Sequence, residues 1–335
     1  MTHGMNVPYP IRLLLWPISV SYGWVAQFRA LLYDKGILES KRLMAPVVSV
    51  GNLTVGGTGK TPMVLWLAER FLGEGKRVAI LSRGYHGTRG TSDEVEMMKR
   101  RLGDRVPFGV GPNRYQEGRR IESEQAVDVF VLDDGYQHLQ IERDVNVLML
   151  DGSKKIREQW LLPAGELREP VSACGRADVI VVTRKQERPD IQAGDSHEHQ
   201  IFYAQTRLLG FRKAREEGTP SFVNELGQGP FFAFCGIGNP RAFFKDLQAW
   251  HIPLAGTQEF RDHHHYSRAD AEELERLATK AGAKGLVTTE KDEQNLRDIT
   301  FDLPVYVAVI DLVFPAESEL DATLRRLMTP RKKAV

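Results

Sequence analysis

The sequence predicts an α/β fold in which a mostly parallel sheet occupies the first part of the chain and a second, smaller α/β unit follows. Two observations support this prediction. Between residues 46 and 184, short β-branched runs alternate with amphipathic stretches, as in repeated strand–helix units. The runs are hydrophobic almost throughout, which is typical of strands buried on both faces of a parallel sheet.

Length and composition limit the possible classes of protein. The chain has 335 residues, of which 42% are hydrophobic and 27% charged, so it can form a sizeable core and keep a charged surface. The net charge of +1 provides no general attraction to nucleic acid or to an anionic surface. The two cysteines, Cys174 and Cys235, form no CxxC pair, which fits a reducing compartment and excludes a thiolate metal site.

The first expected element is an N-terminal helix. Residues 13–28 carry no charge, but this stretch of 16 residues contains Pro17 and Gly23 and is shorter than the roughly 20 residues needed to span a membrane. It also lacks the small-residue cleavage site of a signal peptide. Apolar side chains recur at helical spacing, at Leu14, Ile18, Tyr22, Val25, Phe28 and Leu32. Two interpretations remain open, an interfacial membrane helix and a helix that packs on the core.

The strands expected in the first part are residues 47–50, 77–81, 128–132, 146–150 and 178–182. The chain turns polar after Arg184, and two possible strands follow at 201–208 and 231–234, separated by a charged stretch at 212–218. Beyond them the pattern predicts helices and strands of the second unit: helices at 240–249 and 268–281, strands at 285–288 and 305–310. The resulting division is an amphipathic, membrane-associating helix at 1–35, a first domain at 36–200, a linker at 201–225 and a smaller α/β domain at 226–335.

The strongest motif lies between the strand at 47–50 and a helix expected to begin near Pro62. Residues 49–61 have the sequence SVGNLTVGGTGKT. Glycines let backbone N–H groups surround phosphate oxygens, while the lysine reaches the β- and γ-phosphates and the last hydroxyl ligates Mg²⁺. The first glycine of the usual motif is replaced here by threonine, which makes this the GGxGKT variant. The motif predicts a P-loop NTPase-like α/β/α domain whose nucleotide-binding residues are Thr54, Val55, Gly56, Gly57, Thr58, Gly59, Lys60 and Thr61.

Acidic residues follow the strand at 128–132. Asp133 and Asp134 stand where a phosphate-binding loop requires a carboxylate to support Mg²⁺. Alternation along a strand directs the two side chains to opposite sides, so that one can face the metal. Gln137 and His138 follow after two intervening residues and place polar groups beside the phosphates.

Several other loops are candidates for the rim of the site. Two arginine-bearing turns, at Arg83 and Arg114, could each offer a guanidinium to phosphate, although surface arginines are common. The dense loop at 162–170 has no pattern of regular structure and is expected to border the site. The rim residues expected to face the substrate are Arg83, Tyr85, Gln137, His138, Arg168 and Glu169.

Two polar clusters occur in the second domain. Residues 262–266 have the sequence DHHHY, but consecutive histidines point in different directions, which makes zinc a poor candidate and proton transfer by a histidine beside an aspartate a better one. Residues 288–292, TTEKD, form a charged corner at the end of an expected strand. A helix start capped by threonine is the alternative explanation for that corner.

Taken together, these motifs resemble the tetraacyldisaccharide 4'-kinase family of lipid A biosynthesis over nearly the whole chain. The motifs that carry the resemblance occur in the same order as in the family: the loop at 49–62, LSRGY at 81–85, DDGYQH at 133–138, LPAG at 162–165, LREP at 167–170, Asp262-His263 and TEKD at 289–292. The resemblance implies two α/β/α domains joined by a short β linker. It also implies transfer of phosphate from ATP, with Mg²⁺, to the 4'-hydroxyl of a tetraacylated glucosamine disaccharide 1-phosphate at the cytoplasmic face of the inner membrane.

The resemblance also implies roles for individual residues. Asp93 looks like the general base and His263 like its assistant, although Ser92 departs from the glycine that the family has before this aspartate. Lys60 completes the catalytic set, and Thr61, Asp133, Asp134 and Glu94 are expected on the metal side. The partners implied are the lipid-linked acylated disaccharide and the inner-membrane surface, with no nucleic acid and no obligate protein partner.

Two other functions fit the sequence less well. A membrane-binding P-loop ATPase switch would carry a signature lysine five positions before the loop lysine, and that position holds Val55. A nucleotide-dependent metal chaperone would need a Cys or His cluster near the loop, and neither cysteine lies there.

Overall fold

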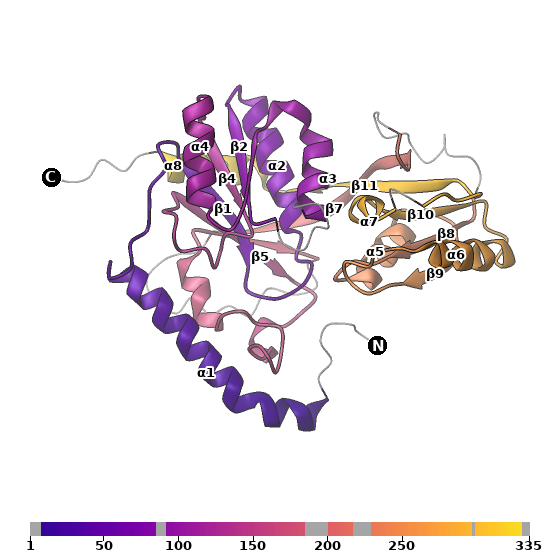
Figure 1. Ribbon diagram of the computed structural model, residues 1–335, viewed down its shortest axis with the longest axis horizontal. Helices are drawn as coiled ribbons and strands as arrows, with labels where there is room; N and C mark the ends of the chain where they lie inside the picture. The colour runs from indigo at the N-terminus through magenta and orange to yellow at the C-terminus, as the bar shows by residue number, and fades with distance from the viewer. Residues whose placement is uncertain (1–7, 85–91, 185–199, 217–228, 297–298, 330–335) are drawn as a thin grey trace. The chain divides into compact units, whose positions relative to one another are not determined.

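The computed structural model describes residues 8–84, 92–184, 200–216, 229–296 and 299–329 (Figure 1). These residues group into two compact units. The larger unit comprises Met5–Thr91, Met98–Gln205 and Leu312–Val335, and the smaller unit contains Ser92–Met97 and Thr206–Asp311. Strands β7 (Gln200–Lys213) and β11 (Val305–Val313) have residues in both.

The larger unit is built on a parallel sheet in the strand order β3-β2-β4-β1-β5-β6-β7. The five strands predicted for this part are present and almost wholly buried, as their continuous hydrophobicity requires. They are β1 (Val47–Asn52), β2 (Val78–Ser82), β4 (Val129–Asp133), β5 (Val145–Asp151) and β6 (Val179–Thr183). The sequence analysis missed β3 (Phe108–Val110), because three residues are too few to show a pattern. The predicted α/β class with a mostly parallel sheet is confirmed.

Helices α2 (Lys60–Gly73), α3 (Asp93–Leu102) and α4 (Arg114–Glu124) connect these strands. Helix α2 contacts β1, β2 and β4 through an almost fully buried apolar side. Helix α4 inserts Ile121 among apolar side chains of β1, β2 and β4. The sheet therefore holds the ends of β1 and β4 side by side, and α2 begins after the loop that follows β1.

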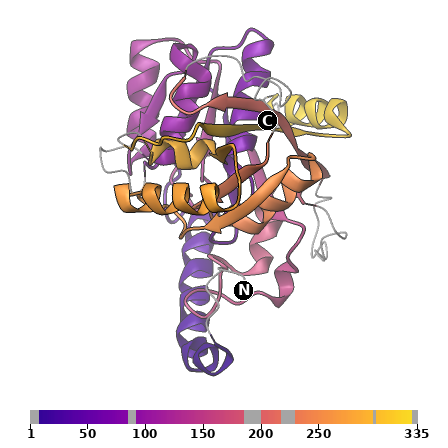
Figure 2. The same ribbon diagram turned by 90° about the vertical axis from the view of Figure 1, so that its right-hand side faces the viewer.

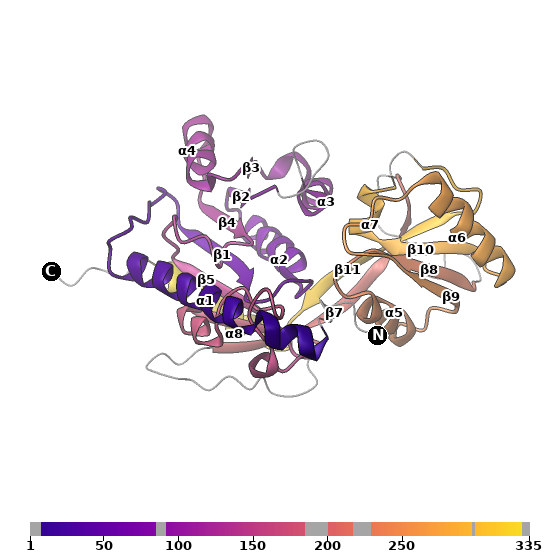
Figure 3. The ribbon, with the colours of Figure 1, turned by 60° about the horizontal axis from the view of Figure 1, so that its bottom comes forward.

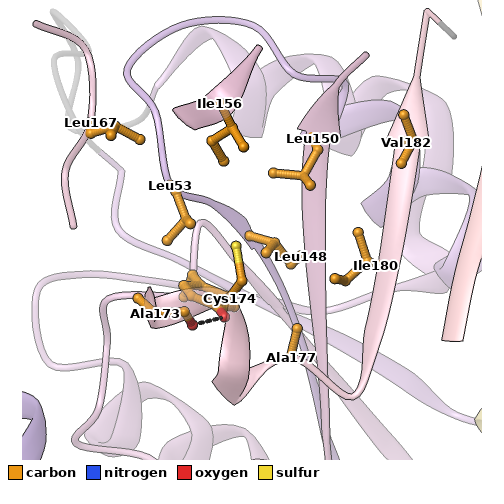
Figure 4. Close-up of a cluster of buried hydrophobic side chains, with 11 residues drawn as sticks. Leu53, Leu148, Leu150, Ile156, Leu167, Ala173, Cys174, Ala177, Ile180 and Val182 are labelled. Atoms are coloured by element: carbon orange, nitrogen blue, oxygen red, sulfur yellow. Dashed lines mark hydrogen bonds between the residues drawn. The ribbon is translucent and has the colours of Figure 1, made fainter. Parts of the chain in front are cut away.

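The segment between β5 and β6 covers part of the sheet without a long helix. It contains only two short 3₁₀ helices, η2 (Ile156–Glu158) and η3 (Val171–Arg176). Their apolar side chains pack on alternate residues of β5 and β6 and on Leu53, which follows β1 (Figure 4). This packing, together with a 2.6 Å hydrogen bond from the Tyr136 hydroxyl to the Ala173 carbonyl, fixes the loop at 162–170 against the end of β1.

Helix α1 (Tyr9–Asp34) runs outside the α/β layers of the larger unit (Figures 1 and 2). Its two fully buried residues are small: the Ser19 hydroxyl accepts a hydrogen bond from the Ala164 amide at 3.1 Å, and Gly23 lies where a Cβ would come within 2.7 Å of Leu161. Many of its large apolar side chains are exposed. The helix therefore does not bury its apolar residues in the core, as the second interpretation of the sequence required. Within the described ranges, no helix combines the length and the hydropathy that crossing a bilayer requires.

The smaller unit contains a parallel arrangement in the order β11-β10-β8-β9. Alternate residues of β8 (Phe231–Cys235) divide between two cores: Phe231 and Ala233 face α5 (Pro240–Ala249), whereas Phe232 and Phe234 face α6 (Arg268–Lys280). The two helices therefore cover opposite faces of the sheet (Figure 3). The predicted helices are present, as are the strands that became β10 (Gly285–Thr289) and β11. Strand β9 (Leu254–Glu259) was missed because its second half, Thr257–Glu259, is polar and the strand is only partly buried.

The C-terminal helix α8 (Glu317–Met328) corrects the sequence-based division of the chain. Residues 226–335 were expected to form one domain, but Leu312–Val335 belongs to the larger unit. The reason is packing against α2: Phe314 lies against Trp66 with ring centroids 4.8 Å apart, and Asp321 forms an ion pair with Arg70.

Candidate active site

The glycine-rich loop lies between β1 and α2, as the motif predicts. Gly59 has a φ of +87° and caps the N-terminus of α2, so that Lys60 and Thr61 form its first turn. A side chain at position 59 would combine this left-handed backbone with a Cβ placed 3.2 Å from the Thr183 methyl group. The glycine is therefore required by both conformation and space.

Carbonyl groups of the loop are bound by side chains at the end of β6. The Thr183 hydroxyl donates to the Thr58 carbonyl at 3.2 Å, and Arg184 donates to the Gly57 carbonyl at 3.1 Å and to Asp151 at 3.0 Å. From the sequence, Thr183 and Arg184 follow an expected strand where a nucleobase pocket is possible, with nothing to choose between them. Their contacts with the loop could not be predicted, since only the fold brings the end of β6 to it. These contacts fix the backbone orientation of the loop.

The loop at 162–170 supports the other end of the glycine-rich loop. The Val55 amide donates to the Glu166 carbonyl at 2.8 Å, and Thr54 forms an isolated bridge with Leu167. The Arg168 amide donates to the Leu53 carbonyl at 2.7 Å. The structure thus brings Arg168 to the residue that precedes the glycine-rich loop, and its role at the rim stays a prediction.

Asp133 and Asp134 have different partners at the end of β4. The buried Asp133 carboxylate accepts a hydrogen bond from the Ser82 hydroxyl at 2.9 Å. Asp134 has a φ of +46° and lies 3.5 Å from the Lys60 ammonium, and Arg168 donates to both of its oxygens at 3.0 and 2.9 Å. Burial by itself would raise the pKa of Asp134, but the charges of Lys60 and Arg168 outweigh it and lower that pKa to about 2.

Arg114 lies in the same cluster, although the sequence indicated it only as one of two arginine-bearing turns. Its side chain is buried, and it donates to the Asp134 carbonyl at 3.3 Å. Its buried Nε has no hydrogen-bond partner among the described residues. Burial lowers the pKa of Arg114, and the nearby Asp133 and Asp134 oppose this effect. Arg114 is therefore a buried cation that binds the Asp134 backbone and interacts electrostatically with the two carboxylates.

Side-chain oxygen atoms that follow β1 and β4 are suited to binding Mg²⁺. The group contains the Thr61 hydroxyl at the start of α2 and the carboxylates of Asp133 and Asp134. These are hard oxygen ligands of the kind that Mg²⁺ prefers. Because Mg²⁺ keeps several waters and is commonly held by one or two carboxylates together with substrate phosphates, this set of side chains fits the ion.

The structure gives the surroundings of most of the remaining residues expected at the rim. Gln137 donates to the Asn52 carbonyl at 2.9 Å, and Glu169 is buried and accepts from Arg176 at 2.6 Å. Burial, followed by the charge of Arg114, lowers the pKa of His138 to about 4. Arg83 is exposed at the end of β2, and Tyr85 lies outside the described residues.

A second cluster lies within the smaller unit, where α3 begins. His263 Nδ1 lies 3.2 Å from Asp93 Oδ2, and Asn295 donates to the same oxygen at 3.1 Å. Burial would raise the pKa of Asp93, but these hydrogen bonds and the charge of Lys291 outweigh it, so the pKa lies below its usual value. The hydrogen bond with Asp93 is also the main reason that the pKa of His263 is raised, against burial and Lys291.

Lys291, which sequence analysis placed only in a charged corner, is part of this cluster. Its ammonium lies 2.9 Å from Asp262, 3.2 Å from Glu94 and 3.2 Å from His263 Nε2. The Glu94 carboxylate, expected on the metal side, is thus paired with a lysine in the smaller unit. Its role as a metal ligand stays a prediction.

The TEKD segment forms α7 (Glu290–Gln294), and Thr289 caps it as the alternative explanation proposed. The Asp292 carboxylate accepts from the Gly236 amide at 2.7 Å and from the Tyr266 hydroxyl at 2.8 Å. The Gly236 carbonyl in turn accepts from the His263 amide at 3.1 Å. This chain of bonds holds the backbone at His263, where φ is +58°.

The three consecutive histidines have separate environments. His264 stacks on Phe260, with ring centroids 4.6 Å apart, and lies 3.2 Å from Asp270, whereas His265 is exposed. In the part of the chain that the structure describes, no three His, Cys, Asp or Glu side chains are grouped so that they could hold a metal ion.

Comparison with known proteins identifies relatives along nearly the whole chain. The family model described as Tetraacyldisaccharide-1-P 4'-kinase matches residues 11–329. The tetraacyldisaccharide 4'-kinase of Geobacter metallireducens is 38% identical, and the alignment covers 94% of this chain and 98% of that protein. The corresponding protein of Pelobacter propionicus is 36% identical, with 94% and 92% covered.

A solved structure shows the same fold. It is the "apo" form of LpxK from Aquifex aeolicus in complex with ATP, which matches with a TM-score of 0.77 and 31% sequence identity. The match covers 95% of this chain and 99% of that one.

Proposed function

The chain belongs to the tetraacyldisaccharide-1-P 4'-kinase family, and we propose that it transfers the γ-phosphoryl group of ATP to the 4'-hydroxyl of a tetraacylated glucosamine disaccharide 1-phosphate. The family identifies the chain as a kinase of lipid A biosynthesis. Such a transfer requires groups that bind the phosphates, support Mg²⁺ and remove the proton of the acceptor hydroxyl.

The glycine-rich loop is proposed to bind the phosphates of ATP. Thr183 and Arg184 bind the Thr58 and Gly57 carbonyls. The loop amides other than that of Val55, which donates to Glu166, are proposed to bind phosphate oxygens. When ATP binds, Lys60 is proposed to leave Asp134 and to contact the β- and γ-phosphates instead. Arg114 and Arg168 are then the cations that balance the negative charge of Asp134 and of the phosphoryl group being transferred.

Thr61 and the pair Asp133 and Asp134 would hold Mg²⁺ with the nucleotide. Bound Mg²⁺ would neutralise charge on the phosphate oxygens. The contribution of the chain is to hold the two carboxylates: Asp133 accepts a hydrogen bond from Ser82, and the charges of Lys60 and Arg168 lower the pKa of Asp134 to about 2, which keeps that carboxylate ionised.

Asp93 is proposed to accept the proton of the sugar hydroxyl. A hydroxyl is a weak nucleophile, so removal of its proton during transfer accelerates the reaction. Both hydrogen bonds described for the Asp93 carboxylate are made to Oδ2. We therefore propose that Oδ1 is the oxygen that accepts the proton of the sugar hydroxyl. His263 donates to Oδ2 and orients the carboxylate.

Helix α1 is proposed to bring the enzyme to its acyl-chain substrate at the cytoplasmic face of the inner membrane. Its exposed apolar side chains include Leu14, Trp24, Val25 and Phe28, which are 77, 71, 68 and 61% exposed. Apolar and tryptophan side chains of this kind suit the interface between headgroups and acyl chains. No nucleic acid or obligate protein partner is proposed.

The observation that carries this proposal is the hydrogen-bonded Asp93–His263 pair in a chain that also has a complete phosphate-binding loop. The test is ATP consumption with Mg²⁺ in the presence and absence of a detergent-dispersed tetraacyl disaccharide 1-phosphate, with the γ-phosphate labelled. We expect acceptor-dependent consumption and label in the lipid. Hydrolysis that ignores the acceptor but responds to bare vesicles would instead support a membrane-binding ATPase switch.

A further inference from the structure

The TEKD segment contains a lysine that the reaction described above does not use. The Lys291 side chain is 18% exposed and faces the Asp93–His263 pair within the smaller unit. Its ammonium has three N–H donors, and the structure provides three acceptors: Asp262 Oδ1 at 2.9 Å, Glu94 Oε1 at 3.2 Å and His263 Nε2 at 3.2 Å. Each donor therefore has one partner.

The contact with His263 determines where the imidazole carries its proton. A lysine ammonium can donate but cannot accept, so His263 Nε2 must accept and must itself lack a proton. A neutral imidazole with a bare Nε2 carries its proton on Nδ1. Nδ1 is the atom that lies 3.2 Å from Asp93 Oδ2, so the ring donates to the carboxylate.

We propose that Lys291 is a positioning residue that holds His263 in its Nδ1-protonated form, in which the ring donates a hydrogen bond to Asp93. The proposal rests on the proposed role of Asp93 as proton acceptor, because the benefit to the reaction is a correctly oriented and ionised Asp93. Lys291 acts through His263 and need not touch the substrate.

The surroundings show why the lysine is needed. Two carboxylates, Glu94 and Asp262, each lie 3.9 Å from His263 Nε2. Without the ammonium they would be the nearest acceptors for a proton on Nε2, and they would favour the opposite tautomer or a rotated ring. Burial would lower the pKa of Lys291, but Glu94 and Asp262 outweigh this effect and raise it, which keeps the ammonium charged.

The role of Lys291 is separate from that of its neighbour Asp292. Asp292 binds the Gly236 amide, and the Gly236 carbonyl binds the His263 amide, so Asp292 supports the backbone. Lys291 contacts the ring. A change at Lys291 is therefore expected to alter the proton position on the imidazole while the loop stays in place.

The direct test is nuclear magnetic resonance of the full-length protein with ¹⁵N-labelled histidine, at a pH where His263 is neutral. The wild-type His263 signals, assigned by their absence in His263→Ala, should show a protonated Nδ1 and an unprotonated Nε2. This measurement needs no change at Lys291, so it remains informative if a variant at that position does not fold.

Variants then test the cause. Lys291→Met should move a measurable share of the proton to Nε2, and Lys291→Arg, which keeps a cationic donor, should restore the wild-type pattern. Lys280→Met is the matched control, because Lys280 is an exposed lysine at the end of α6 in the same unit. It should leave the His263 signals unchanged.

Kinetics connect the proton position to turnover. Lys291→Met should lower kcat by about tenfold or more and leave the KM for ATP unchanged. If Lys291 acts through His263, the double variant with His263→Ala should be no slower than His263→Ala alone, because effects that act through one group are not additive.

The outcomes separate this inference from the proposed function. A protonated Nε2 in the wild type, or an unchanged pattern in a folded Lys291→Met protein, would overturn the inference and leave the proposed function standing. Wild-type turnover in His263→Ala, with a tautomer that still depends on Lys291, would instead refute the proposed role of the Asp93–His263 pair.

Discussion

Membrane attachment by α1 can be predicted quantitatively from side-chain exposure. Leu14, Val25 and Phe28 are 77, 68 and 61% exposed and lie on the side of the helix opposite Ser19 and Gly23, its two fully buried residues. Transfer of such a side chain from water to an apolar environment is worth about 1.5–3 kcal/mol when complete. Scaled by exposure, the three contribute about 3–6 kcal/mol together, which corresponds to roughly a 10²- to 10⁴-fold change in partitioning.

We therefore expect the triple variant Leu14→Ser, Val25→Ser, Phe28→Ser to lose vesicle binding in a sedimentation assay, while ATP binding is retained because none of the three side chains is buried. Gln27→Ser, a change at an exposed polar residue of the same helix, is the control and should bind vesicles as the wild type does. Vesicle binding by the folded triple variant that equals the wild type would refute the role assigned to this helix.

Two further predictions concern the larger unit. Lys60→Met removes the cation expected to contact the phosphates, so turnover should fall by about 10²- to 10³-fold in steady-state kinetics. ATP affinity, measured by calorimetry, should fall as well. Unchanged ATP affinity would contradict the proposed contact. The pKa of His138 is lowered from 6.5 to about 4, so the folded state binds fewer protons than the unfolded state, and the stability present above pH 6.5 should decrease as the pH falls towards 4. Urea denaturation at several pH values should show a weaker acid dependence for His138→Asn, and an identical dependence would show that another group is responsible.

The parts of the fold that could be predicted from the sequence are those determined by neighbouring residues. Nearly continuous apolar runs identified β1, β2, β4, β5 and β6, since a strand buried on both faces is hydrophobic at most positions. Strand β9 could not be predicted in this way, because it is partly exposed and contains the polar residues Thr257–Glu259. The placement of α8 could not be predicted, because it depends on packing of Phe314 against Trp66, far away in the chain.

In the candidate site too, the features that could be predicted are those carried by neighbouring residues. The glycine-rich loop is contiguous, so its chemistry and its position before α2 could be predicted from spacing alone. The pairing of Asp93 with His263 spans 170 residues and was expected only from a family resemblance. The contacts of Arg184 and Lys291 had no local signal, because each depends on side chains that only the fold brings together.

The central claim is that Asp93 removes a proton in a phosphoryl transfer that the glycine-rich loop supports. Asp93→Asn keeps the shape of the side chain and removes its ability to accept that proton. The most direct measurement is the single-turnover rate of γ-phosphate transfer to the tetraacyl disaccharide 1-phosphate, together with ATP affinity, in the wild type and in Asp93→Asn. The account predicts a rate lower by about 10²- to 10⁴-fold with unchanged ATP affinity, and transfer at the wild-type rate by the variant would contradict it.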